Sequence, residues 1–196
     1  MLPQRIEEKY PEWNFSLSLT YPQIRGSDQP YADWFNNLVS RRMEEQRQSD
    51  LQTAADRGDT SDLPLSLTSQ VDYAVLSAEG WYPPDFPWQA MGAAEGIGAQ
   101  QALFDGGHAV LSLLFQNSFY WGGAHPGSWF WTLNFDFQTG QVLDLGDLFI
   151  PGAPYLERIA AYSADRLREQ LDFDLWEEGV APWEDNFAAW ALTPAG

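Results

Sequence analysis

Residues 120–141 read YWGGAHPGSWFWTLNFDFQTGQ, which is the most informative stretch of the chain. Apolar side chains occupy positions 129, 131, 133, 135 and 137, whereas positions 132, 134 and 136 are polar. The alternation predicts a β-strand with one buried face. Phe130 interrupts it, which indicates that the second face is partly covered. Gly140 suits the left-handed position of a hairpin loop, and Gly122-Gly123 suits a sharp corner, because glycine has no Cβ to clash.

The rest of the chain predicts an α+β fold. Residues 13–21 alternate between apolar and polar side chains, as in a strand. Over 29–57, apolar residues recur every three or four positions and predict a helix, whose polar half beyond Arg41 is expected to project into solvent or to fray. Further strands are expected over 63–76, 108–119 and 142–145, and helices over 154–171 and 183–190. We therefore predict an antiparallel sheet with the helices 29–57 and 154–171 packed on one face.

The length indicates a single domain over 1–196, with a strand–helix part over 1–60 and the main sheet over 61–196. An irregular segment interrupts the sheet part, because three prolines within five residues preclude a helix or a central strand. Its large aromatic residues either form a plug that orders the segment or present their rings to a ligand. They are Trp81, Tyr82, Phe86 and Trp88.

The composition limits the kinds of molecule that the chain is expected to bind. The chain has 28 acidic and 10 basic residues, a net charge of −18, which argues against nucleic acid and anionic membrane surfaces. The acidity either serves solubility or a saline habitat, or it attracts a basic partner. There is no cysteine, which excludes disulfides, thiolate nucleophiles and cysteine-ligated metals. No stretch has the apolar core of a signal peptide or the ~20 apolar residues of a membrane span.

The residues with catalytic potential are few. His108 and His125 are the two histidines; His125 is either a base or ligand, or, as we favour, a hydrogen-bonding group within the glycine corner. Asp136, Asp144 and Asp147 could ligate calcium, but turn and capping roles explain Asp136 and Asp147 equally well. The acidic pairs at 177–178 and 184–185 are either paired carboxylates or a solvated face. We therefore predict no enzyme, no metal site and no cofactor.

Three segments together resemble a known family: the corner Tyr120–His125, the strand and turn Asn134–Gly140, and Leu145–Phe149. They are similar to the extracytoplasmic domain shared by RsiV-type anti-sigma factors, which sense lysozyme, and by the N-terminal half of PdaC-type peptidoglycan deacetylases. The resemblance implies that residues 78–107 are an insertion. It also implies a removed leader or anchor, and further strands beyond Gly196 that would leave a sheet edge exposed here. The motif residues it assigns are Tyr120, Gly122, Gly123, His125, Asn134, Asp136 and Gly140.

From this resemblance we expect a non-catalytic binding or sensing module of the bacterial cell envelope, located in the periplasm, secreted or membrane-anchored. The expected partner is a basic protein such as a lysozyme-like wall enzyme. One alternative is an envelope enzyme or carbohydrate-binding accessory domain that uses the aromatic insertion, and another is a purely structural domain. The candidate binding residues are Trp81, Tyr82, Phe86, Trp88 and Trp121.

Overall fold

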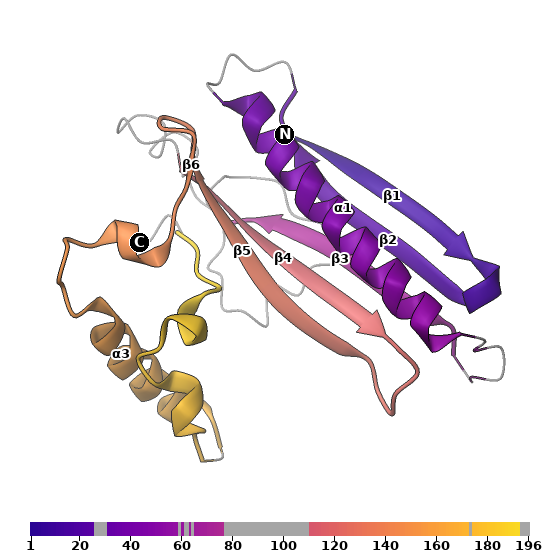
Figure 1. Cartoon of the computed structure of the whole chain (residues 1–196). Helices are drawn as coiled ribbons and strands as arrows, with labels where there is room; N and C mark the ends of the chain where they lie inside the picture. Colours follow the sequence, from indigo (N-terminus) through magenta and orange to yellow (C-terminus); the bar gives the residue numbers. More distant parts are fainter. Residues whose placement is uncertain are drawn as a thin grey trace. The chain divides into compact units, whose positions relative to one another are not determined.

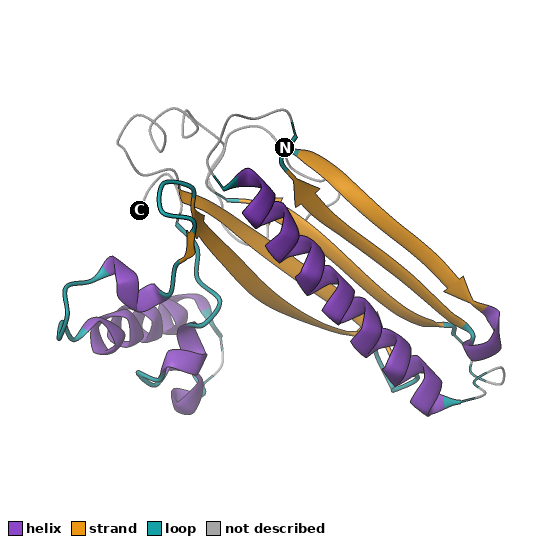
Figure 2. Cartoon of the chain, turned by 45° about the horizontal axis from the view of Figure 1, so that its top comes forward, coloured by secondary structure: helices purple, strands orange, loops and turns teal. Residues whose placement is uncertain are grey.

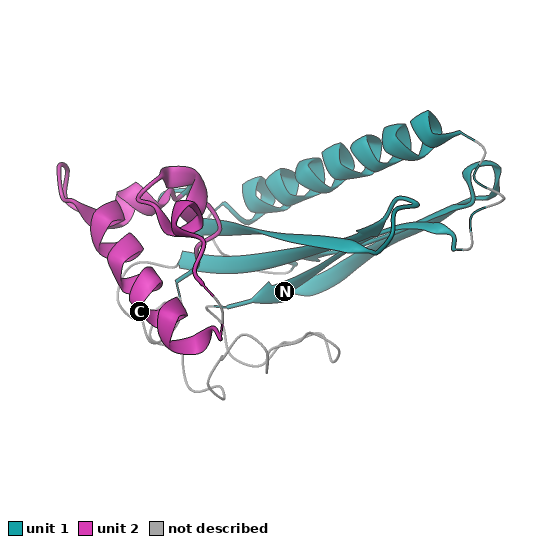
Figure 3. Cartoon of the chain, turned by 90° about the horizontal axis from the view of Figure 1, so that it is seen from below, with its two compact units in different colours: residues 1–142, 191–196 teal, residues 143–190 magenta. Residues whose placement is uncertain are grey.

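The computed structural model describes residues 1–25, 31–58, 60, 63, 65–76, 110–172 and 174–192 (Figure 1). The chain divides into two compact units (Figure 3). Unit 1 comprises Met1–Val142 with Ala191–Gly196, and unit 2 comprises Leu143–Trp190. The predicted insertion at 78–107 lies outside the described residues, as do the aromatic residues in it.

Unit 1 contains a six-stranded sheet whose strands follow one another in chain order. Every neighbouring pair is antiparallel except β2 and β3, which are parallel because a helix connects them. The α+β class is confirmed, and the sheet is mixed but mostly antiparallel. The strands are β1 (Leu2–Tyr10), β2 (Phe15–Gln23), β3 (Leu67–Val75), β4 (Val110–Tyr120), β5 (Gly127–Asp136) and β6 (Gln141–Val142).

The helix α1 (Ala32–Arg57) runs along one face of this sheet (Figure 2). Its predicted apolar stripe is buried at Phe35, Leu38, Val39 and Met43. The Phe35 ring meets that of Phe135 at 5.4 Å, edge to face, which joins α1 to β5. Tyr31 was expected in the same stripe but is half exposed.

The prediction that α1 projects or frays beyond Arg41 is wrong. The helix continues to Arg57, and both Asp50 and Ala54 are buried. The Asp50 carboxylate accepts hydrogen bonds from Gln46 at 2.9 Å and from Ser69 of β3 at 2.8 Å. Polar residues can therefore face the sheet here, because their hydrogen bonds are satisfied across the interface.

Two differences concern the strands. β1 was not predicted, because it is an outer strand with charged residues and only Ile6 and Tyr10 pack against the core. The strand expected over 142–145 is wrong at its end, since β6 stops at Val142 and a 3₁₀ turn, η3 (Leu145–Leu148), begins at Leu145. Asp144 and Asp147 cap this turn reciprocally, which stops extended pairing.

Two strands lie at the edges of the sheet within the described part of the chain, and the exposure of an edge there stays a prediction. β1 pairs only with β2, and β6 pairs only with Phe135 and Asp136 of β5. The outer edge of β5 from 127 to 134 therefore has no neighbouring strand among the described residues. Such edges expose main-chain donors and acceptors.

Unit 2 is helical. It contains α3 (Tyr155–Gln170) and the 3₁₀ turns η3, η4 (Glu177–Val180) and η5 (Glu184–Phe187). The remaining 3₁₀ turn of the described residues, η1 (Pro11–Trp13), lies in unit 1 and joins β1 to β2. The helix α3 buries Ala160 and Ala164 within its apolar face. α3 belongs to unit 2 and the sheet to unit 1, so the predicted packing of α3 on the sheet stays a prediction. Among the described helices, none has the length and apolar character needed to cross a membrane.

Candidate functional site

The glycine corner between β4 and β5 has a structural role. Gly122 has φ +81°, and a Cβ added there would lie 2.9 Å from Cδ1 of Leu63. Gly123 has open space around it. His125 is exposed, and its Nδ1 lies 2.9 Å from the carbonyl oxygen of Pro126. Gly122 thus adopts a positive φ, as suits the predicted glycine corner, and His125 makes a local contact.

The second motif forms the turn between β5 and β6. The Asp136 side chain accepts hydrogen bonds from the Gln138 amide at 2.7 Å and the Thr139 hydroxyl at 2.9 Å. Gly140 has φ +73°, and its amide donates to the Asp136 carbonyl. Both carboxylate oxygens of Asp136 are therefore engaged in the turn. Among the described residues, no group of three His, Cys, Asp or Glu side chains could hold a metal ion.

The predicted aromatic binding residues divide into two groups. Trp81, Tyr82, Phe86 and Trp88 lie outside the described residues. Trp121 is partly buried, and its ring stacks on Phe15 of β2 at 5.3 Å. Its ring is engaged with the core. Tyr120 and Asn134 of the motif are buried as well.

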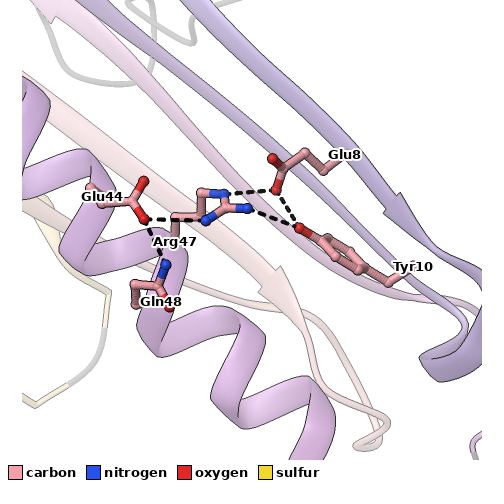
Figure 4. Close-up of polar contacts among 5 residues, drawn as sticks. All are labelled: Glu8, Tyr10, Glu44, Arg47 and Gln48. Carbon is pink, nitrogen blue, oxygen red and sulfur yellow. Dashed lines mark hydrogen bonds and ion pairs between the residues drawn. The ribbon is translucent and has the colours of Figure 1, made fainter.

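A polar network ties β1 to α1 (Figure 4). Arg47 donates to Glu8 at 2.8 Å and to the Tyr10 hydroxyl at 3.3 Å, and Tyr10 donates to the same carboxylate of Glu8. On its other side Arg47 contacts Glu44 at 3.2 Å. The hydrogen bond from Arg47 lowers the pKa of Glu8. Each charge in this network has a partner, so the network holds an outer strand rather than offering a site.

Unit 2 offers a different arrangement, in the segment 176–185. Trp176 is 72% exposed and Trp183 is 57% exposed. Each precedes a 3₁₀ turn, and Asn186 links the two turns by donating to the carbonyl oxygens of Glu178 and Ala181. The indole of Trp176 also packs beside Gly179. Both rings thus protrude from a short, hydrogen-bonded frame. The helix expected over 183–190 is wrong, because only the 3₁₀ turn η5 forms in that segment.

The charge of unit 2 is strongly negative. Residues 143–190 include 11 acidic and 3 basic residues, so they carry −8 of the chain's −18. Glu177 pairs with Arg168 at 2.9 Å, but Glu178, Glu184 and Asp185 make no ion pair with a described residue. Exposed tryptophans that are followed in the chain by carboxylates without an ion pair suit contact with a cationic surface.

A cavity of about 390 Å³ adjoins this segment within unit 2. Three acidic residues, Asp144, Glu184 and Asp185, line it together with the aromatic residues Tyr155 and Phe187. The remaining lining residues are Leu145, Gly146, Leu156, Ala188 and Trp190. Carboxylates and aromatic rings both attract cations, so the cavity is chemically suited to a lysine or arginine side chain.

Comparison with known proteins shows distant similarity. The chain is 30% identical over 87 residues to the peptidoglycan-N-acetylmuramic acid deacetylase PdaC of Bacillus subtilis (strain 168), covering 42% of this chain and 19% of that protein. It is 28% identical over 124 residues to Esterase Rv3036c of Mycobacterium tuberculosis (strain ATCC 25618 / H37Rv), covering 63% of this chain and 53% of that protein. The chain thus spans about a fifth of the first relative and about half of the second. No family model matches.

Among solved structures, a DUF3298 family protein from Pseudomonas aeruginosa PAO1 aligns with a TM-score of 0.48 and 14% sequence identity. The alignment covers 87% of this chain and 69% of that one. The predicted resemblance to PdaC-type proteins is confirmed as distant sequence similarity. The link to RsiV-type anti-sigma factors stays a prediction.

Proposed function

We propose that this chain is a non-catalytic binding module of the bacterial cell envelope, located outside the cytoplasm, whose partner is a basic protein such as a lysozyme-like wall enzyme. The observation that carries the proposal is the segment 176–185. There Trp176 and Trp183 protrude next to carboxylates that have no cationic partner among the described residues.

The two features of this segment act at different stages of binding. The net charge of −18 sets up a long-range field that speeds encounter with a basic protein. After contact, exposed tryptophans supply apolar area and act as anchors, while the unpaired carboxylates meet lysine or arginine side chains. Steering therefore determines the association rate, and the tryptophans determine how long the complex lasts.

The envelope location is supported by the similarity to PdaC, a protein named for its action on peptidoglycan. A module that accompanies such chemistry would meet basic wall enzymes in the same compartment. Trp81, Tyr82, Phe86 and Trp88 were also predicted to contact the partner. Their contribution stays a prediction, to be tested by Trp88→Ala, which we expect to accelerate dissociation even at high salt.

The direct test is calorimetry of a basic lysozyme with this protein at low salt. We expect binding that weakens as salt rises, because the screening length falls from ~10 Å at 0.1 M to ~3 Å at 1 M. The double variant Trp176→Ala/Trp183→Ala should weaken binding about hundredfold, the scale of losing interface anchors. Tyr162→Ala is the matched control, because Tyr162 is 64% exposed in the same unit but outside the segment.

Three results would contradict this proposal. If the calorimetric titration with lysozyme gave no heat, lysozyme would be excluded as the partner. If an acidic control protein bound equally well, the proposed role of charge would be excluded. Equal losses in the double variant and in Tyr162→Ala would remove the segment 176–185 as the binding surface.

An envelope enzyme is the second candidate, favoured by the similarity to Esterase Rv3036c over 124 residues. Assays of p-nitrophenyl ester hydrolysis test it, with His108→Ala and His125→Ala as variants of the two histidines. Turnover that either substitution abolishes would replace the non-catalytic proposal. A purely structural domain would give neither turnover nor binding.

A further inference from the structure

A second surface lies in unit 1, where a groove of about 280 Å³ runs between α1 and β5. Its aromatic wall consists of Trp129 and Trp131, and its polar wall includes Arg42, Gln46 and Ser49 of α1. The other lining residues are Met43, Glu45 and Val71. The groove belongs to the helix-covered face of the sheet in unit 1, whereas the segment 176–185 belongs to unit 2.

The two tryptophans have different roles. They stand on the same face of β5 because they are two positions apart. Trp131 is fixed, since its ring stacks on Phe115 at 4.0 Å with an interplanar angle of 4° and its Nε1 donates to Asn117 Oδ1 at 3.2 Å. Trp129 is 46% exposed. The groove thus offers one rigid ring and one accessible ring.

Asn117 supplies an independent indication of a ligand. It is 2% exposed and stands between Val71 and Trp129 in the register of the sheet, and both of these neighbours line the groove. Its Nδ2 has no hydrogen-bond partner among the described residues. A buried amide donor without a partner is costly, and a ligand carbonyl oxygen that accepted from it would remove that cost.

We propose that this groove binds a glycan built from N-acetylated amino sugars. The C–H groups of a sugar ring would lie on the Trp129 indole, whose face carries partial negative charge. Arg42, Gln46 and Ser49 offer a guanidinium, an amide and a hydroxyl to the sugar hydroxyls. Asn117 Nδ2 would donate to the acetamido carbonyl once the Trp129 ring turns to admit the sugar.

The position of the groove disfavours other ligand classes. An extended peptide pairs with a strand through main-chain groups, which lie in the plane of the sheet and are not offered on its face. Nucleotides and other phosphates meet the repulsion of a net charge of −18. Recognition on this face therefore rests on rings and neutral or cationic side-chain donors, which suit an uncharged sugar.

The test is titration of the whole chain with tri-N-acetylchitotriose, without lysozyme, followed by calorimetry and tryptophan fluorescence. We expect saturable binding that Trp129→Ala weakens about tenfold. Phe130→Ala is the matched control, because Phe130 is 42% exposed but stands on the opposite face of β5, and it should leave binding unchanged. Cellotriose, which lacks the acetamido group, should bind at least about tenfold more weakly.

Ser49→Phe keeps the test valid if Trp129→Ala fails to fold, because Ser49 is exposed on α1 and the larger side chain blocks the groove without disturbing the core. Absence of binding to the chitotriose, or equal losses in Trp129→Ala and Phe130→Ala, would overturn the glycan site. Equal affinity for cellotriose would overturn the role of Asn117. If Trp129→Ala weakens binding of lysozyme and not of the chitotriose, the groove is a protein interface. If Trp176→Ala/Trp183→Ala weakens binding of lysozyme and leaves binding of the chitotriose unchanged, the two sites are independent.

Discussion

The two units differ in whether particular acidic side chains have hydrogen-bond or ion-pair partners. In unit 1, Glu8 is bound by Arg47 and Tyr10, and the buried Asp50 is bound by Gln46 and Ser69. In unit 2, Glu178, Glu184 and Asp185 have no ion pair with a described residue and lie beside exposed tryptophans. Paired charges between elements hold a fold together, whereas unpaired charges next to exposed rings suit an encounter with another molecule.

The largest difference in stability loss is expected between a substitution in the core of unit 1 and a substitution of an exposed ring in unit 2. Phe115 is fully buried and stacks on Trp131, so Phe115→Ala should cost about 3–5 kcal/mol of stability through cavity formation. Trp176→Ala removes an exposed ring and should change stability by no more than ~0.5 kcal/mol. Urea denaturation of both variants gives the comparison. A comparable loss in Trp176→Ala would show that the segment 176–185 is structural.

The next effect concerns the corner. Gly122→Val should cost more than ~1 kcal/mol, because it combines a left-handed φ with a Cβ that meets Leu63. Gly123→Val should cost less than ~0.5 kcal/mol, since the space around Gly123 is open. Thermal unfolding of the pair measures both costs. Equal costs would contradict the local account of the motif.

Asp50 should produce a stability loss at higher pH. Burial raises the pKa of Asp50, against the opposing hydrogen bonds from Gln46 and Ser69. The folded state therefore holds the proton more tightly than the unfolded state. The protonated Asp50 carboxyl therefore contributes fully to the stability of the fold below the unfolded pKa of ~3.9. This contribution is lost as the pH rises through the pKa of Asp50 in the folded state. Asp50→Asn should gain stability relative to the natural chain as the pH rises above ~4. If the stability of Asp50→Asn and that of the natural chain changed with pH in the same way, the role of Asp50 would be contradicted.

Glu8 should show the opposite and smaller trend. Because Arg47 lowers the pKa of Glu8, its contribution is present above the unfolded pKa of ~4.3 and is lost as the pH falls through the folded value. Glu8→Gln should therefore cost stability at neutral pH and little at low pH. Denaturant midpoints at pH 7 and at low pH measure the difference. Glu7→Gln is the control, because the ion pair of Glu7 with Arg5 is solvent-exposed and should contribute little to stability. A cost that is the same at both pH values would remove the ion pair as its cause.

Local patterns in the sequence predicted much of the sheet and little of the candidate sites. The strands at 13–21 and 129–137 and the apolar stripe of α1 follow from periodicity, which places side chains on faces without knowledge of their neighbours. The exposed Trp176 and Trp183 were missed because composition does not say which tryptophans a small unit leaves uncovered. A signal existed in the acidic residues beside them, which we interpreted as either paired carboxylates or a solvated face.

The α+β class, the left-handed turn at Gly140 and the glycine corner at 122–123 could be predicted from the sequence, because they depend on local periodicity and on residues adjacent in the chain. The pairing of β1 with the sheet, the parallel pairing of β2 with β3 and the burial of Asp50 could not be predicted from it. Nor could the sequence predict that Asn117 stands beside two groove residues with an Nδ2 that has no hydrogen-bond partner among the described residues. These features depend on partners brought together from distant elements, whose positions no local pattern encodes.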